Sequence, residues 1–362
     1  MSKKINLNLN SVEHLPTPHD ILHELPISLH QQAFIQDTRG KINDILSSDN
    51  SRLLLIVGPC SIHDPKAALE YAKKLRELAP QVSDTFLVVM RVYFEKPRTT
   101  VGWKGLLYDP HLNGSHDLVT GIRMTRKLLL DLADLEVACA AEFLDPFSCY
   151  YFSDLISWAC IGARTSESQT HRQMASALPM PVAFKNNTNG SIDVAVNGIV
   201  SASTPHVFMG VNEHGQMSLM HSSGNPHCHV ALRGGENKPN YDPQSIAKAL
   251  TYLQKQGLPK RVVIDCSHDN SNRKHEQQPL VFQSIINQII EGEQYIRGMI
   301  LESNLEAGNQ ALLADRSKLR YAVSLTDPCM DWTTTEHLIR WGHAMLSKEN
   351  MCQNKLAMTI ST

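Results

Sequence analysis

Short apolar runs alternate with amphipathic stretches along most of the chain, and this alternation predicts strands and helices in turn. In the first run, residues 53–57 (LLLIV), five consecutive apolar positions indicate a strand buried on both faces. Gly58-Pro59 ends the strand, and Asp64-Pro65 supplies an N-cap acceptor followed by a proline suited to the first turn of a helix. Apolar residues then recur on one stripe of residues 66–79. This segment is therefore predicted to be a strand, a polar loop and a helix.

The same unit recurs until the chain contains eight of them. The predicted strands are 53–57, 86–91, 138–142, 161–164, 181–185, 228–233, 261–268 and 298–302. The predicted helices are 66–79, 117–135, 148–158, 168–178, 192–202, 242–257, 279–290 and 335–346. Eight successive strand–helix units are typical of an α/β protein with a (β/α)8 fold, the TIM barrel.

Two further segments are not needed to close such a barrel, which takes roughly 250 residues. Residues 1–50 carry irregularly spaced apolar side chains and then a helical stretch near 31–46, and we predict an N-terminal extension with regulatory or oligomer contacts. Within 206–221, two short apolar runs flank Asn-Glu-His-Gly, which predicts an inserted β-hairpin. The predicted organisation is an extension over 1–50, a catalytic barrel over 51–350 that includes the hairpin, and a C-terminal tail over 351–362.

Composition narrows the location and the partners. No apolar run approaches the ~20 residues that span a bilayer, and the first residues lack the apolar core of a signal peptide, so we predict a cytoplasmic protein with no membrane partner. The eight cysteines include no CxxC pair and are interpreted as reduced thiols. A net charge of −2 argues against a nucleic-acid partner. Any site for anions must therefore be local.

A polar or ionisable residue stands at the carboxyl end of every predicted strand. These residues are Cys60, Arg91, Glu142, Arg164, Lys185, Arg233, His268 and Glu302. In a barrel the carboxyl ends of the strands converge on one face, where active sites are built. We therefore expect residues that are far apart in the sequence to form one pocket.

Four of these residues are cationic, namely Arg91, Arg164, Lys185 and Arg233. A single arginine is most often a solvated surface residue, but four at strand ends would share a partly desolvated pocket. Such a pocket is tolerable only if anions neutralise the cations, and guanidinium groups suit phosphate and carboxylate. The segment 95–100 adds Lys96, Arg98 and two threonines. We expect a ligand with at least two anionic groups.

The remaining residues indicate a metal site. Cys60, His268 and Glu302 offer sulfur, nitrogen and oxygen donors, and Asp327 in the loop after the last strand offers a second carboxylate. A lone cysteine more often packs in a core and a lone histidine more often makes an ordinary hydrogen bond, so the shared position at strand ends carries this hypothesis. The donor set suits Mn²⁺, Fe²⁺, Co²⁺ or Zn²⁺ better than Mg²⁺ or Ca²⁺. Beside several cations, a divalent ion fits a Lewis acid acting on a phosphorylated carbonyl substrate.

Seven segments closely resemble class I 3-deoxy-D-arabino-heptulosonate 7-phosphate (DAHP) synthases of microbes, which begin the shikimate pathway. They are GPCSIHDP (58–65), MRVYFEKPRTTVGWKG (90–105), IGARTSESQTHR (161–172), LRGGENKPNY (232–241), DCSHDNSN (265–272), ESNLEAGNQ (302–310) and SLTDPCMDW (324–332). The resemblance extends over essentially the whole chain, in order, and KPRTTVGWKG is highly specific.

The resemblance implies a metal-dependent condensation of phosphoenolpyruvate with erythrose 4-phosphate and water. Its implied metal ligands are Cys60, His268, Glu302 and Asp327. Its implied phosphoenolpyruvate contacts are Arg91, Lys96, Glu142, Arg164, Lys185 and Arg233. Arg98 and Thr99 would hold the phosphate of the sugar. Lys96 is the favoured proton donor near the aldehyde oxygen, and His268 is the alternative. Cys60 is counted among the catalytic residues because it would hold the metal.

The resemblance also implies an effector and an assembly. Additions such as the extension and the hairpin form regulatory and subunit contacts in this family, so we expect feedback inhibition by an aromatic amino acid and a homodimer or homotetramer. The phenylalanine-sensitive type usually has a proline and a serine where this chain has Cys149 and Pro179. The segments MPVAF and DCSHDNSN are closer to the tyrosine-sensitive type, which favours tyrosine.

Two alternatives stay open at this point. A synthase of the related eight-carbon 3-deoxy sugar acid phosphate would share the phosphoenolpyruvate site, although KPRTT followed by VGWKG favours the four-carbon aldose phosphate. A non-catalytic barrel that senses a metabolite is the second alternative. Such a protein would be expected to have lost a metal ligand, whereas all four candidates are present.

Overall fold

Eight parallel strands close into a barrel in the spatial order β1-β10-β9-β8-β5-β4-β3-β2. The computed structural model describes residues 7–236 and 238–360, and side chains as far as residue 348. The barrel strands are β1 (Leu53–Gly58), β2 (Phe86–Arg91), β3 (Cys139–Glu142), β4 (Trp158–Ile161), β5 (Val182–Lys185), β8 (His229–Leu232), β9 (Val262–Asp265) and β10 (Ile296–Glu302). The predicted (β/α)8 barrel is confirmed.

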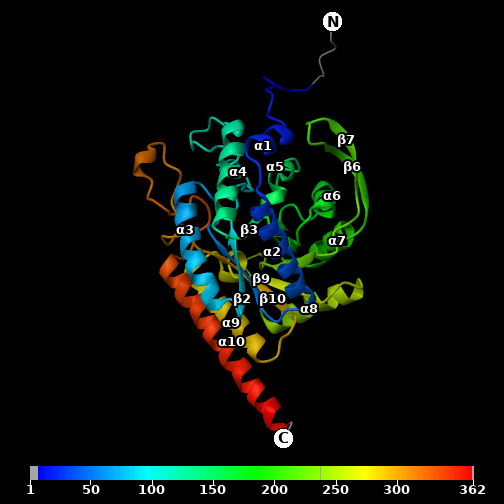
Figure 1. The fold of residues 1–362 in the computed structure, drawn as a ribbon, viewed down its shortest axis with the longest axis vertical. Coiled ribbons are helices and arrows are strands. Elements are labelled where there is room, and N and C mark those ends of the chain that lie inside the picture. Colours follow the sequence, from blue (N-terminus) through cyan, green and yellow to red (C-terminus); the bar gives the residue numbers. More distant parts are fainter. Residues whose placement is uncertain (1–6, 237, 361–362) are drawn as a thin grey trace.

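A helix follows each barrel strand and packs on the outside of the barrel (Figure 1). These helices are α3 (Pro65–Leu78), α4 (Leu118–Asp134), α5 (Cys149–Phe152), α6 (Gln169–Ala177), α7 (Asp193–Ala202), α8 (Pro243–Lys255), α9 (Gln278–Ile290) and α10 (Trp332–Ile360). Local capping sets several starts: Asp64 accepts from the amides of Lys66 and Ala67 at the head of α3, and Asp242 caps α8 in the same way.

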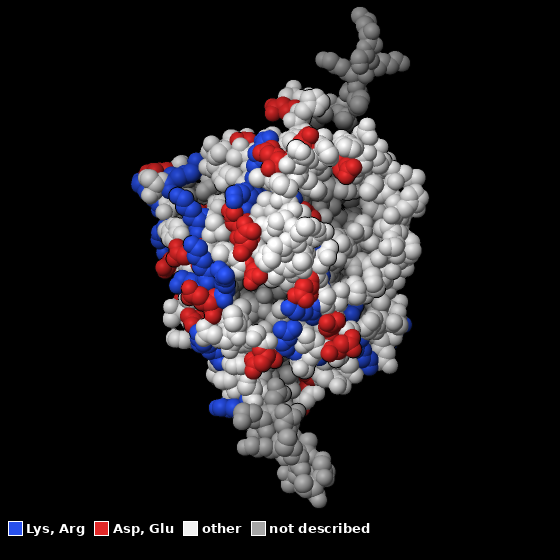
Figure 2. Space-filling model, viewed as in Figure 1, with Lys and Arg blue, Asp and Glu red and all other residues white. Residues whose placement is uncertain are grey.

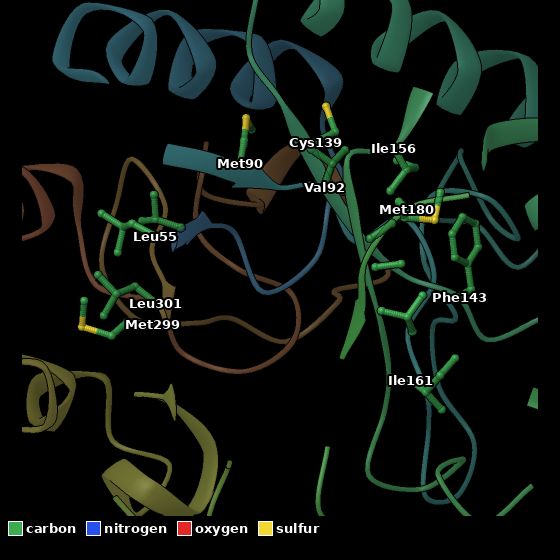
Figure 3. Close-up of a cluster of buried hydrophobic side chains, with 14 of the residues drawn as sticks. Leu55, Met90, Val92, Cys139, Phe143, Ile156, Ile161, Met180, Met299 and Leu301 are labelled. Carbon is green, nitrogen blue, oxygen red and sulfur yellow. The ribbon is translucent and has the colours of Figure 1, made fainter. Parts of the chain in front are cut away.

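The apolar core has two layers because each barrel strand is buried on both faces. Along β1, Leu55 and Val57 face the helices, whereas Leu54 and Ile56 face the barrel interior. Figure 3 shows part of the outer layer, to which β1, β2 and β10 contribute Leu55, Met90 and Met299. This double burial explains why the strands read as continuous apolar runs.

The extension and the hairpin are attached to this barrel. Helix α2 (Leu29–Ser47) packs Ile42, Ile45 and Leu46 with the inner residues of the barrel, and Arg297 of β10 donates to the carbonyl of Ile45. Strands β6 (His206–Val211) and β7 (Met217–Ser222) form a two-stranded antiparallel sheet, which confirms the predicted hairpin. Figure 1 shows the hairpin standing beside α6, on the same side of the molecule as α1 (Pro18–Glu24).

Several elements differ from the prediction. The predicted helix 148–158 is only α5 followed by a 3-10 turn at Ser153–Leu155, and the next strand begins at Trp158 instead of Ile161, because the buried indole packs inside the barrel. Helix α1 was not predicted. The predicted last helix, 335–346, is too short: α10 continues to Ile360, so residues 351–360 of the expected tail are helical. Residues 1–6 of the extension and 361–362 of the tail lie outside the described residues.

Candidate active site

The residues expected at the strand ends do converge on one end of the barrel. Arg91, Glu142, Lys185 and Glu302 are the last residues of their strands, Arg233 follows β8 directly, and Cys60 lies two residues after β1. Two predicted strand ends are wrong. Strands β4 and β9 end at Ile161 and Asp265, so Arg164 and His268 each lie three residues further on, in loops that fold back over the same end.

A cavity of about 270 Å³ occupies this end of the barrel. The predicted site residues that line it are Lys96, Arg98, Thr99, Glu142, Arg164, Lys185, Arg233, His268 and Asp327, together with Thr188, Arg273 and Thr326. Cys60, Arg91 and Glu302 are buried and do not line this cavity. Gly162 leaves room for a carboxylate, because a Cβ there would meet Oε1 of Glu142 at 2.1 Å.

Three of the four strand-end cations already have carboxylate partners within the protein. Arg91 pairs with Glu302 at 2.9 Å, Lys185 with Asp265 at 2.9 Å and Arg233 with Asp269 at 2.7 Å, and all six residues are buried. The expectation that these cations need ligand anions for their neutralisation was therefore wrong. Internal pairing makes their burial tolerable and fixes their direction.

The fourth strand-end cation, Arg164, is exposed, and its Nη2 donates to Thr99 Oγ1 at 3.2 Å. Arg98 is exposed as well. In the described part of the chain, Arg98, Arg164 and Lys96 make no ion pair with a carboxylate, whereas Arg273 binds Asp269 at 2.9 Å. The cavity therefore presents three cations that are free of a carboxylate partner among the described residues.

A cluster of metal-binding atoms lies beside these cations. One donor atom each from Cys60, Glu302 and Asp327 lies within 4.8 Å of the others. His268 stands at the edge of this group, with its Nε2 at 3.9 Å from Glu302 Oε1. Sulfur, imidazole and carboxylate donors together form a set that transition-metal dications accept. All four predicted ligands are thus neighbours, although His268 is not within the tightest group.

The protonation of Cys60 and Lys96 depends on the charges that lie near them. Burial, with the nearby Glu302 carboxylate, raises the pKa of the Cys60 thiol to about 12, so Cys60 is a thiol unless a cation is added. Burial opposes the charge of Lys96, but the negative charge of Cys60 when it is ionised, together with the Glu302 and Asp327 carboxylates, raises the pKa of its ammonium above the usual value. Lys96 Nζ donates to the carbonyl of Cys60 at 3.1 Å and to its Sγ at 3.2 Å. Lys96 is therefore a cationic hydrogen-bond donor at the donor cluster.

Sequence reasoning missed the two buried carboxylates Asp265 and Asp269. They flank His268 within the segment DCSHDNSN, and that position was the available signal. Although burial opposes ionisation, His268 and Lys185 hold the pKa of Asp265 well below its usual range. Asn186 was missed as well: it accepts from the amide of Arg233 at 2.8 Å and so joins the loops after β5 and β8.

Figure 2 shows the distribution of charge on one face of the molecule. Acidic and basic side chains are interspersed there, and the hairpin side is largely uncharged. Among the described residues, no helix is both long and apolar enough to cross a membrane.

Comparison with known proteins agrees with this geometry. The model of the DAHP synthetase I family matches residues 24–340. The Tyr-sensitive phospho-2-dehydro-3-deoxyheptonate aldolase of Escherichia coli K12 is 48% identical over 94% of this chain and 96% of its own length. The Phe-sensitive enzyme of the same strain is 44% identical over 92% of this chain and 95% of its own length.

A solved structure agrees as well. The phospho-2-dehydro-3-deoxyheptonate aldolase of Francisella tularensis SCHU S4 superimposes with a TM-score of 0.91 and 39% identity, covering 94% of this chain and 99% of that one. The family match covers residues 24–340, the relatives match over nearly their full length, and the barrel is shared. The chain therefore belongs to the DAHP synthetase I family, the class I DAHP synthases.

Proposed function

We propose that this protein condenses phosphoenolpyruvate with D-erythrose 4-phosphate and water to give DAHP and phosphate, the first step of the shikimate pathway. The observation that carries the proposal is the cavity at the carboxyl ends of the strands, where the free cations Lys96, Arg98 and Arg164 adjoin a sulfur, imidazole and carboxylate donor cluster. Phosphoenolpyruvate and the aldose phosphate together bring two phosphates and one carboxylate. The relatives that carry the name phospho-2-dehydro-3-deoxyheptonate aldolase support this reaction class.

Phosphoenolpyruvate would bind deep in the cavity. Lys185 and Arg233 line the cavity and are held in place by their carboxylate partners, so they can receive the phosphate and carboxylate without first being ordered. Arg91 is fixed by Glu302 but is buried outside the cavity lining, so it contributes positive charge rather than a direct contact. Arg164 at the rim and Glu142 on the wall complete this subsite. Arg98 and Thr99 lie further out in the loop after β2, where the phosphate of erythrose 4-phosphate can be held.

Cys60, His268, Glu302 and Asp327 would hold a divalent cation such as Mn²⁺, Fe²⁺, Co²⁺ or Zn²⁺. When bound, that cation supplies Lewis acidity for the aldehyde of the sugar phosphate. The donor set fits it, because sulfur, imidazole and carboxylate donors lie together. Among the described residues, Lys96 contacts Cys60 and Arg91 contacts Glu302, so positive charge already adjoins the two buried donors.

The protein's own residues have distinct tasks in the reaction. C3 of phosphoenolpyruvate forms a bond to the aldehyde carbon of erythrose 4-phosphate, and the Lys96 ammonium donates a proton or hydrogen bond to the aldehyde oxygen. Water adds at C2 of the former phosphoenolpyruvate, the bond from C2 to the phosphate oxygen breaks, and C2 becomes the ketone carbon. Of the two protons that this water gives up, one leaves with the phosphate and the other replaces the proton taken up by the aldehyde oxygen. Arg233 and Arg164 stabilise the departing phosphate.

A steady-state assay of phosphate release with both substrates tests the proposal. Arg98→Ala should raise the KM for erythrose 4-phosphate by about 10-fold or more, the loss of one charge-assisted contact, with a much smaller effect on the KM for phosphoenolpyruvate. Arg76→Ala, on α3, is the surface control. Absence of turnover with the wild-type protein, or faster turnover with a five-carbon than with a four-carbon aldose phosphate, would overturn the assignment.

We also propose that an aromatic amino acid inhibits the enzyme, with tyrosine favoured. A second cavity, of about 490 Å³, lies between helices α5 and α6 and the hairpin and is lined mainly by apolar side chains, among them Met174, Phe208 and Met220. Cys149 and Pro179, the positions singled out for effector choice, both line it. The Tyr-sensitive relative is 48% identical and the Phe- and Trp-sensitive relatives of the same strain are 44% identical, which supports tyrosine.

We further propose that the protein forms a homodimer or homotetramer through the extension and the hairpin. The outer face of the hairpin exposes four large apolar side chains, those of Val207, Met209, Met217 and Leu219. An apolar sheet face of this kind is typical of a subunit contact. The extension lies beside it, because the amide of His19 donates to the carbonyl of Glu213 at 2.8 Å. Light scattering should find an oligomer in the wild-type protein and a smaller species in Leu219→Lys.

A further inference from the structure

One oxygen of Asp265 joins the two halves of the candidate site. Its Oδ2 accepts a hydrogen bond from Nζ of Lys185 at 2.9 Å and lies 3.0 Å from Nδ1 of His268. Asp265 is the last residue of β9 and is completely buried. His268 belongs to the donor cluster, whereas Lys185 belongs to the anion-binding wall, so a single carboxylate contacts both.

The hydrogen bonds around Asp265 determine which nitrogen of His268 carries the proton. Nδ1 of His268 lies 3.0 Å from Asp265 Oδ2 and 2.6 Å from Ser267 Oγ. The Ser267 hydroxyl in turn lies 2.7 Å from Asp265 Oδ1 and can donate to it. Nδ1 must then be the donor, because an ionised carboxylate only accepts. The lone pair is left on Nε2, the nitrogen that points toward Glu302.

The backbone of His268 shows that this orientation is imposed by the surroundings. Its φ of 56° lies in the left-handed region, which is uncommon for a residue with a side chain and persists only where neighbouring contacts hold it. Here the carbonyl of His268 accepts from the amide of Arg273 at 2.7 Å, which closes the turn after β9. The imidazole is thus placed against Asp265 at the expense of backbone strain.

We propose that Asp265 is a positioning residue that aims both the Nε2 of His268 at a divalent cation and the ammonium of Lys185 at the anionic substrate. The inference rests on the proposed function, because it takes His268 as a metal ligand and Lys185 as a phosphoenolpyruvate contact. A carboxylate behind a ligating imidazole fixes the tautomer and ring orientation, and its removal typically weakens metal binding about 10- to 100-fold. Loss of the same carboxylate also leaves the Lys185 ammonium without its partner.

Asp269 provides a matched control for Asp265. It is equally buried and also has two basic partners, but these are Arg233 at 2.7 Å and Arg273 at 2.9 Å, and its carboxylate makes no hydrogen bond or ion pair with His268 among the described residues. Asp265→Asn and Asp269→Asn both remove one negative charge from the same pocket. A purely electrostatic loss of cation affinity would therefore appear in both variants, whereas a loss of orientation would appear only in the first.

The experiment titrates the full-length protein with Co²⁺ alone and follows the charge-transfer absorption from the Cys60 thiolate, a signal that needs no turnover. Asp265→Asn should bind Co²⁺ about 10- to 100-fold more weakly than wild type, with the band still reached at saturation. Asp269→Asn should bind Co²⁺ like wild type. Calorimetric titration with phosphoenolpyruvate should show weaker binding in both variants, because each loses the partner of one cation in the subsite.

Ser267→Ala keeps the test decisive if Asp265→Asn does not fold, since it removes only the hydroxyl between Asp265 and His268. It should weaken Co²⁺ binding by about 2- to 10-fold, the range of one neutral hydrogen bond. Equal Co²⁺ affinity in the wild type, Asp265→Asn and Ser267→Ala, or an equal loss in Asp265→Asn and Asp269→Asn, would overturn the inference while leaving the proposed function intact. A wild-type protein without a thiolate–Co²⁺ band would overturn the metal site and the inference together.

Discussion

The backbone amide of Cys60 donates to Sγ of Cys329 at 3.4 Å, although 269 positions separate the two cysteines in the sequence. Both side chains are completely buried. Their proximity follows from the loop after β10, which carries Asp327 to the donor cluster and Cys329 with it. Burial raises the pKa of both thiols, that of Cys60 to about 12, so the pair is protonated and slow to react at neutral pH.

We predict that this pair forms a disulfide when the metal-free protein is oxidised. Copper treatment should link Cys60 to Cys329, abolish turnover and be reversed by a thiol reductant, whereas prior Mn²⁺ should protect both thiols. Peptide mass spectrometry identifies the link. The variant Cys329→Ser cannot form it and serves as the control. Two free thiols after exhaustive oxidation of the metal-free wild type would contradict the prediction.

Activity should depend on a divalent cation. Chelation should abolish turnover and Mn²⁺ or Co²⁺ should restore it, because without a cation the Cys60 thiol is protonated beside the Glu302 carboxylate. Cys60→Ala should lose at least about 100-fold in kcat, since metal affinity falls with the loss of a ligand. Cys139→Ala, in the outer core layer, should respond to metal like the wild type. Full activity in the chelated protein or in Cys60→Ala would refute the metal assignment.

Inhibition by tyrosine should depend on the cavity beneath the hairpin. Phe208→Ala removes an aromatic side chain from its wall and should raise the half-inhibitory concentration of tyrosine by about 10-fold or more, with kcat and both KM values close to wild type. Leu280→Ala removes an exposed apolar side chain on α9 and is the control.

The extension is a less direct probe of the same inhibition. Removal of residues 1–30 should keep every proposed site residue and lose inhibition. That deletion also removes the completely buried Ile21 and so disturbs packing. Phe208→Ala is therefore the sharper test. Wild-type turnover that is indifferent to saturating tyrosine, phenylalanine and tryptophan would refute the regulatory proposal.

Acid should destabilise the fold through His229. The indole of Trp158 donates to His229 Nε2 at 3.1 Å, so this ring is neutral with its proton on Nδ1, and burial lowers its pKa to about 3. Below its ordinary pKa of about 6.5 the unfolded state binds a proton that the folded state does not. The contribution of neutral His229 to the free energy of unfolding is therefore fully present above pH ~7, and it falls by about 1.4 kcal/mol per pH unit below pH ~6.5.

The variant His229→Gln, whose amide oxygen can accept from Trp158, isolates this effect. The difference in free energy of unfolding between wild type and His229→Gln should shrink as pH falls from about 7 to about 4, measured by urea titration at a fixed protein concentration. His337→Gln, at an exposed position, is the matched surface control. A constant difference for His229→Gln would contradict the neutral-imidazole assignment.

The barrel and most of its site could be predicted from the sequence because their signals are local. Strand β2 begins and ends where its apolar run does, and Asp64-Pro65 begins α3 as predicted, since capping and double burial act within a few residues. The site followed from one further rule, that parallel strands in a barrel bring their carboxyl ends together. That rule placed Arg91, Lys185 and Glu302 at one end of the barrel without any knowledge of side-chain packing.

The interactions that pair these residues depended on the tertiary structure. Asp265 meets Lys185 across 80 positions and Glu302 meets Arg91 across 211, and no periodicity in the sequence encodes which carboxylate reaches which cation. The same holds for Trp158. The local pattern placed it at the end of the predicted helix 148–158, whereas it begins β4 because its indole packs in the barrel interior. Local propensity and strand order determine the position of a residue in the barrel, whereas close packing among distant segments determines which residues its side chain contacts.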